Sequence, residues 1–125
     1  MSKNSKVLLV DDDANLLELY STVFRKNNLN FVIAKNGNQA LDKATSEKPN
    51  LILLDIMLPD VNGFDVLKQL RANPETKGIT IWMLTVLAEQ SNKTKAQELG
   101  ADDYIVKSSY TPQQIVAKVK EFLAK

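Results

Sequence analysis

One stretch of the chain, residues 51–64, reads L-I-L-L-D-I-M-L-P-D-V-N-G-F. It opens with four branched apolar residues, and such a run without polar alternation is typical of a parallel strand covered on both faces. Asp55 follows the run directly, and the breaker Asn62-Gly63 precedes the next apolar positions. The stretch therefore predicts a buried strand that delivers a carboxylate at its carboxyl end, followed by a loop.

Similar short apolar runs recur on both sides of this stretch, separated by segments with helical spacing. The other runs are residues 7–10, 31–34, 79–84 and 104–106. The helical stripe after the first run consists of Leu16, Leu19, Tyr20, Val23 and Phe24. Five strands alternating with five helices predict an α/β fold, a doubly wound parallel sheet with helices on both faces. The last predicted helix extends to Lys125, so we expect a single domain over residues 1–125 with no output domain in this chain.

The composition narrows the classes of function. Lys and Arg number 16 and Asp and Glu 15, and the net charge of +1 provides no electrostatic reason to expect nucleic acid or an anionic membrane as partner. The absence of Cys and His excludes disulfides, thiolate metal sites and histidine-based catalysis. The first apolar run is too short for a signal peptide or a membrane span, so a cytoplasmic location is the default expectation.

Polar residues follow four of the five predicted strands. Asp11-Asp12-Asp13 follows the first, Asp55 the third, Thr85 ends the fourth, and Lys107 follows the fifth. The carboxyl ends of parallel strands form the ligand-binding edge of such a sheet. Clustered carboxylates attract a hard cation, and Mg²⁺ is favoured over Ca²⁺ where phosphate oxygens also bind. Because a hydroxyl and an ammonium can bind phosphoryl oxygens and a carboxylate can attack phosphorus, this edge predicts phosphoryl transfer.

Each of these residues also has a plain structural interpretation. Asp13 is typical of a helix N-cap, and Asp55 alone could end a strand in a turn. Thr85 alone could be an ordinary strand residue, Lys107 a solvated charge, and Tyr104 a core residue with a satisfied hydroxyl. The functional interpretation is favoured because the separate structural roles would all have to coincide at one edge of the sheet.

Four segments, taken in order, carry a family resemblance. They are V-L-L-V-D-D-D (7–13), the stretch 51–64, W-M-L-T-V (82–86) and G-A-D-D-Y-I-V-K (100–107). Together they resemble the receiver domains of bacterial two-component response regulators of the stand-alone type, over essentially the whole chain. The resemblance implies a flavodoxin-like sheet with strand order 2-1-3-4-5. It also implies a phosphorylation-activated signalling switch rather than an enzyme, apart from the domain's own phosphorylation and dephosphorylation.

The resemblance assigns roles to individual residues. Asp55 resembles the phosphoacceptor, which takes a phosphoryl group from a sensor histidine kinase or a phosphotransfer protein. Asp12 resembles the main Mg²⁺ ligand, and Asp11, Asp55 and the backbone carbonyl of Met57 would complete the metal site. Lys107 resembles the lysine that pairs with a phosphoryl oxygen.

Other matching residues concern the response to phosphorylation. Thr85 resembles the switch hydroxyl that moves to the new phosphoryl group, and Tyr104 resembles the aromatic residue that turns inward with it. Pro59 and Gly63 match the family's loop after the phosphorylation site. Family members bind partners through the face of the fourth helix, fifth strand and fifth helix, so we expect a downstream protein or a second copy of the chain there. The all-polar segment 90–95 predicts a weakly anchored fourth helix.

Three departures from the family pattern carry predictions. Val86 follows the switch hydroxyl where the family usually has a small residue, and we expect it to slow phosphorylation. Ser108 stands in place of a proline that follows a cis peptide bond. Because a cis bond before a non-proline residue costs about 3 kcal/mol, we expect Lys107-Ser108 to be trans and the aim of Lys107 to be affected. Met57 and Leu87 occupy the two positions that, in the family, flank the phosphoryl group and tune its hydrolysis. Because both are apolar here, we expect them to hinder an attacking water and prolong the phosphorylated state.

Rival functions stay open on the sequence. Val86 and Ser108 are compatible with a degenerate receiver that acts as a phosphorylation-independent interaction module. Asp11 and Asp13 have the spacing of the nucleophile and second carboxylate of an Asp-based phosphatase, although 125 residues leave no room for a cap domain. A flavin or nucleotide binder is disfavoured, because three carboxylates follow the first strand where a phosphate loop would be rich in Gly, Ser or Thr.

Overall fold

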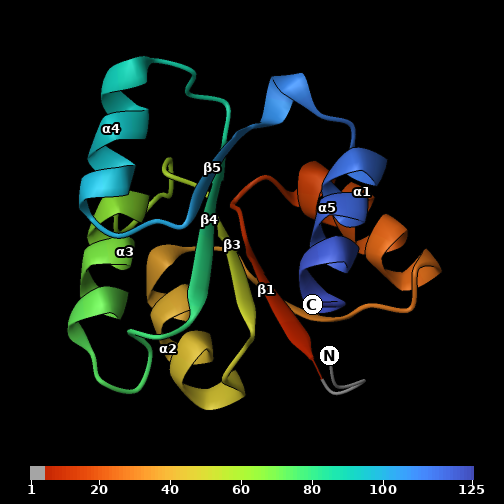
Figure 1. Ribbon diagram of the computed structural model, residues 1–125, viewed down its shortest axis with the longest axis horizontal. Coiled ribbons are helices and arrows are strands. Elements are labelled where there is room, and N and C mark those ends of the chain that lie inside the picture. Colours follow the sequence, from red (N-terminus) through yellow and green to blue (C-terminus); the bar gives the residue numbers. More distant parts are fainter. Residues whose placement is uncertain (1–4) are drawn as a thin grey trace.

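The computed structural model describes residues 5–125 and arranges them as one parallel sheet between two layers of helices (Figure 1). Residues 1–4 of the predicted domain lie outside the described residues. The strands are β1 (Lys6–Val10), β2 (Asn30–Ala34), β3 (Leu51–Leu54), β4 (Thr80–Thr85) and β5 (Asp103–Val106). The helices are α1 (Ala14–Lys26), α2 (Gly37–Glu47), α3 (Gly63–Ala72), α4 (Gln90–Glu98) and α5 (Pro112–Leu123), and a 3₁₀ turn covers Lys107–Ser109. The strand order β2-β1-β3-β4-β5 confirms the predicted fold class.

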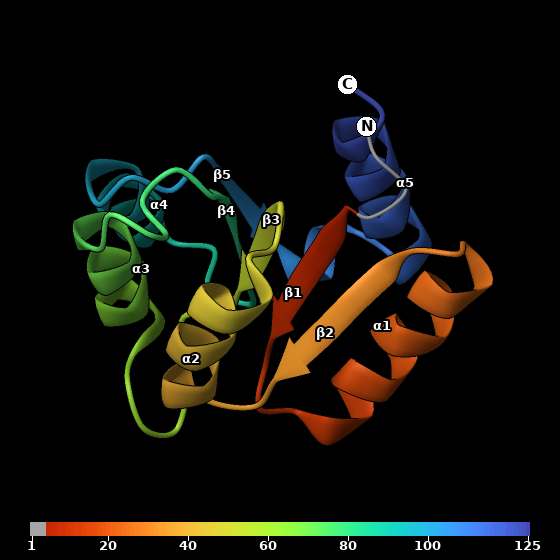
Figure 2. The same ribbon diagram turned by 90° about the horizontal axis from the view of Figure 1, so that it is seen from below.

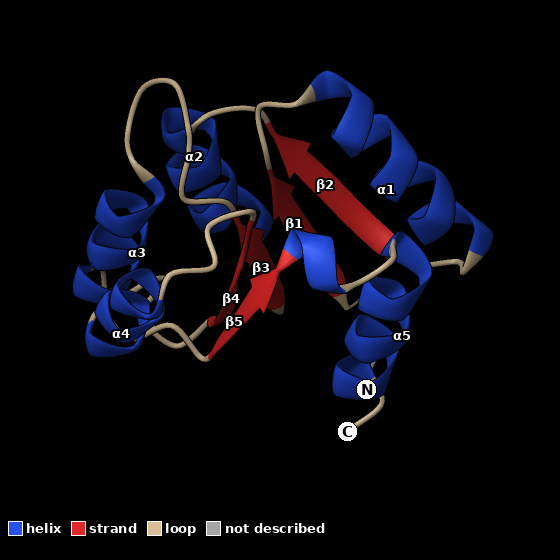
Figure 3. Cartoon of the chain, turned by 90° about the horizontal axis from the view of Figure 1, so that it is seen from above, coloured by secondary structure: helices blue, strands red, loops and turns tan. Residues whose placement is uncertain are grey.

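The two faces of the sheet bury alternate residues of the same strands. In β1, Leu8 and Val10 pack with α2, α3 and α4, while Val7 and Leu9 pack with α1 and α5. Figures 2 and 3 show these two helical layers on opposite sides of the sheet, with β2 along its edge beside β1. All four of these β1 side chains are at most 1% exposed, which explains why the strands appear in the sequence as apolar runs without alternation.

The predicted stripe of the first helix was wrong at one position. Leu19 is 48% exposed, whereas Leu17, which the stripe omitted, is 3% exposed and packs with Tyr20 and Phe24 in the core. At about 100° per residue, Leu19 lies roughly 200° around the helix from Leu17 and therefore faces away from the sheet. The spacing of the other apolar residues allowed either assignment, and the packing of α1 against the sheet selected Leu17.

Helix α4 is anchored weakly, as its polar sequence predicts. Ala96 is its one buried side chain, and Glu89 at its N-cap makes no side-chain capping hydrogen bond. The loop after the helix is held more firmly, because Arg71 donates hydrogen bonds to the carbonyl of Gly100 at 2.9 Å and to the carboxylate of Asp102 at 2.9 Å. The N-terminal part of α4 is therefore the more easily displaced.

Gly63, the first residue of α3, lies directly against the backbone of Asp55. A Cβ atom at Gly63 would lie 2.1 Å from the Asp55 carbonyl oxygen and 2.6 Å from the Cα atom of Ile56. The Gly63 N–H also donates a hydrogen bond to the Ile56 carbonyl at 2.8 Å. This close approach joins the start of α3 to the end of β3, and it requires a residue without a side chain.

We expect Gly63→Ala to lower the free energy of unfolding by about 3 kcal/mol, because the clashing atoms belong to the backbone and cannot rotate away. The control is Gly78→Ala, since a Cβ atom there meets nothing within 4 Å. That variant should stay within about 1 kcal/mol of the wild type. Urea unfolding followed by the fluorescence of Trp82, the chain's one tryptophan, measures both. Equal midpoints for the two variants would contradict the steric argument.

Candidate functional site

The polar residues predicted at the strand ends do meet at one edge. Asp11 follows β1, Asp55 follows β3, Thr85 ends β4 and Lys107 follows β5. In the sheet, β1 pairs directly with β3, with Val10 beside Leu54, so the next residues of both strands, Asp11 and Asp55, are neighbours. The strand order therefore brings together two carboxylates that are far apart in the sequence.

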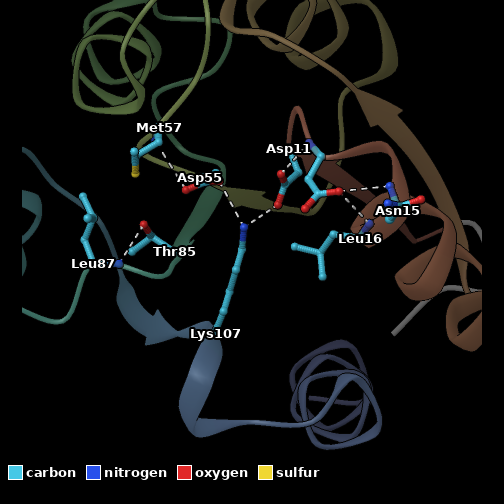
Figure 4. A network of polar contacts seen from close by, with 9 residues as sticks. Asp11, Asn15, Leu16, Asp55, Met57, Thr85, Leu87 and Lys107 are labelled. Carbon is cyan, nitrogen blue, oxygen red and sulfur yellow. Dashed lines mark hydrogen bonds and ion pairs between the residues drawn. The ribbon is translucent and has the colours of Figure 1, made fainter.

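Lys107 connects these two carboxylates. Its Nζ atom donates a hydrogen bond to Asp11 at 2.5 Å and to Asp55 at 3.0 Å, and Figure 4 shows its extended side chain reaching between them. Asp11 is 2% exposed and Asp55 6% exposed, so both carboxylates are nearly withdrawn from water. The ammonium compensates charge that would otherwise be costly to bury.

The pKa values of Asp55 and Lys107 reflect both their burial and their opposite charges. Burial raises the pKa of Asp55 above its usual range; Lys107 opposes the shift without cancelling it, and the nearby Asp11 adds to it. Burial alone would lower the pKa of Lys107, but the hydrogen bond to Asp11 and the charges of Asp55 and Asp11 outweigh it and raise that pKa. Lys107 is therefore held as a cation beside its two partners.

Asp12 joins the other two carboxylates in a group suited to a metal ion. One carboxylate oxygen from each of Asp11, Asp12 and Asp55 lies within 4.8 Å of the others, and Asp12 is exposed to solvent. The three acidic side chains outnumber the single ammonium of Lys107, so the cluster carries an excess of negative charge. Oxygen donors with this excess charge fit a hard divalent cation such as Mg²⁺. Met57 lies beside them, and its N–H donates a hydrogen bond to Asp55 at 3.3 Å.

Asp13 has a different role from its two neighbours. Its carboxylate accepts hydrogen bonds from the backbone N–H groups of Asn15 at 3.0 Å and Leu16 at 3.2 Å, which makes it the N-cap of α1. This confirms the structural interpretation of Asp13. It also removes the second carboxylate on which the phosphatase alternative depended.

Thr85 and Tyr104 are linked through the backbone of Leu87. The Thr85 hydroxyl oxygen accepts a hydrogen bond from the Leu87 N–H at 3.3 Å, and the Tyr104 hydroxyl donates one to the Leu87 carbonyl at 2.6 Å. Thr85 is fully buried and Tyr104 is 9% exposed. Burial, reinforced by the charges of Glu89 and Asp55, raises the pKa of Tyr104. In this structure Tyr104 already points inward with its hydroxyl satisfied.

The positions that depart from the family pattern surround the cluster. Val86 is 58% exposed and Met57 is 56% exposed, while Leu87 is half-buried. No peptide bond within residues 5–125 is cis. Lys107-Ser108 is therefore trans, as predicted from the cost of a cis bond before a non-proline residue. The concern that a trans bond would misdirect Lys107 is not borne out, because its Nζ atom contacts both carboxylates.

Asp60 is a further polar residue of this region that no pattern in the sequence singled out. Its carboxylate accepts hydrogen bonds from the backbone N–H groups of Gly37 at 2.7 Å and Asn38 at 3.0 Å. These donors begin α2, far from Asp60 in the sequence. The available local signal was an acidic residue in a loop, which is common in turns of every kind.

Comparisons with known proteins agree with this geometry. The family model of the response regulator receiver domain matches residues 7–120. The alkaline phosphatase synthesis transcriptional regulatory protein PhoP of Bacillus subtilis is 40% identical over 120 residues, which are 96% of this chain and 49% of PhoP. The DNA-binding response regulator MtrA of Mycobacterium tuberculosis is 40% identical over 115 residues, which are 92% of this chain and 49% of MtrA. The chain thus spans about half the length of these relatives.

Solved structures show the same fold. The BeF3-activated N-terminal receiver domain of RstA from Klebsiella pneumoniae has a TM-score of 0.86 at 31% identity, with 97% of this chain and 100% of that chain covered. A response regulator structure from Chloroflexus aurantiacus has a TM-score of 0.85 at 34% identity, with 97% and 98% covered.

Within residues 5–125, no helix combines the length and the apolar character that crossing a bilayer requires. The family match covers most of the chain, and the solved receiver domains share its fold. The chain belongs to the family of response regulator receiver domains.

Proposed function

We propose that this protein acts in the cytoplasm and that its Asp55 accepts the phosphoryl group, with Mg²⁺, from a sensor histidine kinase or a phosphotransfer protein. The observation that carries the proposal is the arrangement of Asp55 itself. It is nearly buried, bonded to Lys107 at 3.0 Å, and within 4.8 Å of two further carboxylate oxygens. A carboxylate in such a setting is a competent nucleophile toward phosphorus.

The transfer requires positioning and charge neutralisation more than acid–base chemistry. A carboxylate oxygen of Asp55 attacks the phosphorus of a phosphohistidine, the new P–O bond forms as the P–N bond breaks, and the imidazole leaves with the electron pair. Mg²⁺, held by Asp11, Asp12, Asp55 and the Met57 carbonyl, would neutralise phosphoryl oxygens. The Lys107 ammonium, within reach of Asp55, binds another phosphoryl oxygen.

The response would start at Thr85. When its hydroxyl moves to donate a hydrogen bond to the phosphoryl group, it gives up the contact with the Leu87 N–H, and Leu87 also holds the Tyr104 hydroxyl. The segment that follows leads into α4, whose N-terminal part is weakly anchored. The expected output is a changed α4–β5–α5 face for a partner protein or a second copy of the chain, with phosphorylation shifting an existing equilibrium.

Incubation with acetyl phosphate and Mg²⁺ should add one phosphoryl group, measured as intact mass, and Asp55→Asn or omission of Mg²⁺ should abolish the gain. Asp42→Asn, which alters an exposed carboxylate of α2, should gain mass like the wild type. No gain in the wild type would favour the alternative, a phosphorylation-independent interaction module. Multiple turnover of a phosphomonoester would favour a phosphatase.

Lys107→Met should slow phosphorylation by acetyl phosphate by roughly a hundredfold, because one positioned charge on the phosphoryl oxygens is lost. At the same time the variant should bind Mg²⁺ more tightly, since the competing cation between Asp11 and Asp55 is gone. Lys68→Met, at an exposed position of α3, is the control and should change neither quantity. An unchanged phosphorylation rate in Lys107→Met would contradict the role assigned to Lys107.

The apolar side chains of Met57 and Leu87 should give a long-lived phosphorylated state, and Met57→Asn should shorten it several-fold by orienting a water molecule. Leu19→Asn is a matched control, because Leu19 is similarly exposed but lies on α1 away from the cluster. Loss of the phosphoryl group from the wild type within seconds, followed by mass, would contradict the proposed shielding.

A further inference from the structure

The loop between β3 and α3 begins beside Asp55 and contacts α2 at its tip. Two oxygens of the Asp60 carboxylate accept hydrogen bonds from two successive backbone N–H groups, those of Gly37 and Asn38, at 2.7 Å and 3.0 Å. These are the first two amides of α2, which have no partner within the helix. One side chain of the loop thus caps a helix that precedes it in the sequence.

A steric contact reinforces the polar one. At Gly37 a Cβ atom would lie 2.7 Å from the Val61 Cβ atom and 2.8 Å from the Val61 carbonyl oxygen, so α2 begins in direct contact with the residue after Asp60. Val61 in turn packs against the core cluster on that face of the sheet. The tip of the loop is therefore held at two adjacent residues, by hydrogen bonds at Asp60 and by packing at Val61.

The charge of Asp60 suits this role. Although loss of contact with water alone would raise its pKa, the hydrogen bonds from Asn38 and Gly37 outweigh that effect and lower the pKa of Asp60. A carboxylate at a helix N-terminus is also favoured by the helix dipole. Asp60 is therefore ionised, and holds both amides, throughout the neutral range.

The base of the same loop is held by the backbone. The Ile56 carbonyl accepts hydrogen bonds from the N–H groups of Gly63 at 2.8 Å and Leu58 at 3.1 Å. Between this base and the Asp60 tip lies Met57, whose N–H contacts Asp55 at 3.3 Å. A short segment tied at both ends loses little further entropy when one of its carbonyls binds a ligand.

We propose that Asp60 is a positioning residue for the phosphorylation site: by fastening the loop tip to α2, it holds the backbone of Met57 in place as a metal ligand. This inference rests on the proposed function, because it assumes that the Met57 carbonyl contributes to Mg²⁺ binding. Asp60 touches neither the metal nor the phosphoryl group, and acts through the loop.

The test uses two substitutions at Asp60 and a matched control in the chain of 125 residues. Asp60→Ala removes both acceptors, and Asp60→Asn keeps one. The control is Asn36→Ala, because Asn36 caps the same helix through a hydrogen bond from the Gln39 N–H at 2.8 Å but is not part of the loop. Urea unfolding establishes how far each variant destabilises the fold.

The deciding measurement is the dissociation constant for Mg²⁺ by calorimetry. Asp60→Ala should weaken binding by about tenfold, the low end of what loss of a supporting contact around a metal site costs. Asp60→Asn should fall between Ala and wild type, and Asn36→Ala should bind like the wild type. Wild-type affinity in Asp60→Ala, or equal weakening in Asp60→Ala and Asn36→Ala, would overturn the proposal.

Amide hydrogen exchange separates failure of this inference from failure of the proposed function. In Asp60→Ala the amides of Met57, Leu58, Asp60 and Val61 should exchange faster than in Asn36→Ala, with or without Mg²⁺. If the wild type binds no Mg²⁺, the proposed metal site is wrong, and the exchange rates still decide whether Asp60 fastens the loop. Unchanged exchange at these four amides in Asp60→Ala would refute the fastening itself.

Discussion

Two carboxylates held side by side out of water are the constraint on which the acidic edge depends. Asp11 and Asp55 follow adjacent strands and are nearly buried, and without a cation their repulsion would disfavour the folded arrangement. Lys107 reaches them from the end of β5, past β4, and its one ammonium contacts both. With the exposed Asp12 beside them, negative charge stays in excess. The same arrangement that relies on Lys107 therefore keeps an excess of negative charge that suits a divalent cation.

Three consecutive aspartates have three different roles because their side chains lie in different places. Asp11 still follows the line of β1 and points to Lys107, Asp12 lies exposed at the rim of the cluster, and Asp13 caps α1. The cap also satisfies backbone amides that would otherwise lack partners at the start of α1. An extended strand that turns into a helix within three residues sends successive side chains in different directions, so the three carboxylates are not interchangeable.

The surroundings of Asp55 are rigid on one side and compliant on the other. Toward α2 and α3, the close approach of Gly63 and the hydrogen bonds of Asp60 fix the loop. Toward α4, the links include the hydrogen bonds through Leu87 and the one buried residue of that helix, Ala96. The asymmetry suits the proposed roles of the site, because a rigid side would keep the geometry around a cation and the weakly held side would be the one displaced.

The sequence alone determined the five strands, the five helices and the edge where the polar residues meet. Apolar runs and breakers are local features, and the carboxyl ends of parallel strands gather at one edge for any strand order. Only the tertiary structure decided that Leu17 rather than Leu19 faces the core, and that Asp60 binds α2. It also decided that Lys107 bridges Asp11 and Asp55 although its peptide bond to Ser108 is trans. Each of these depends on which distant residues a side chain meets, and contacts between separate elements leave no pattern in the local sequence.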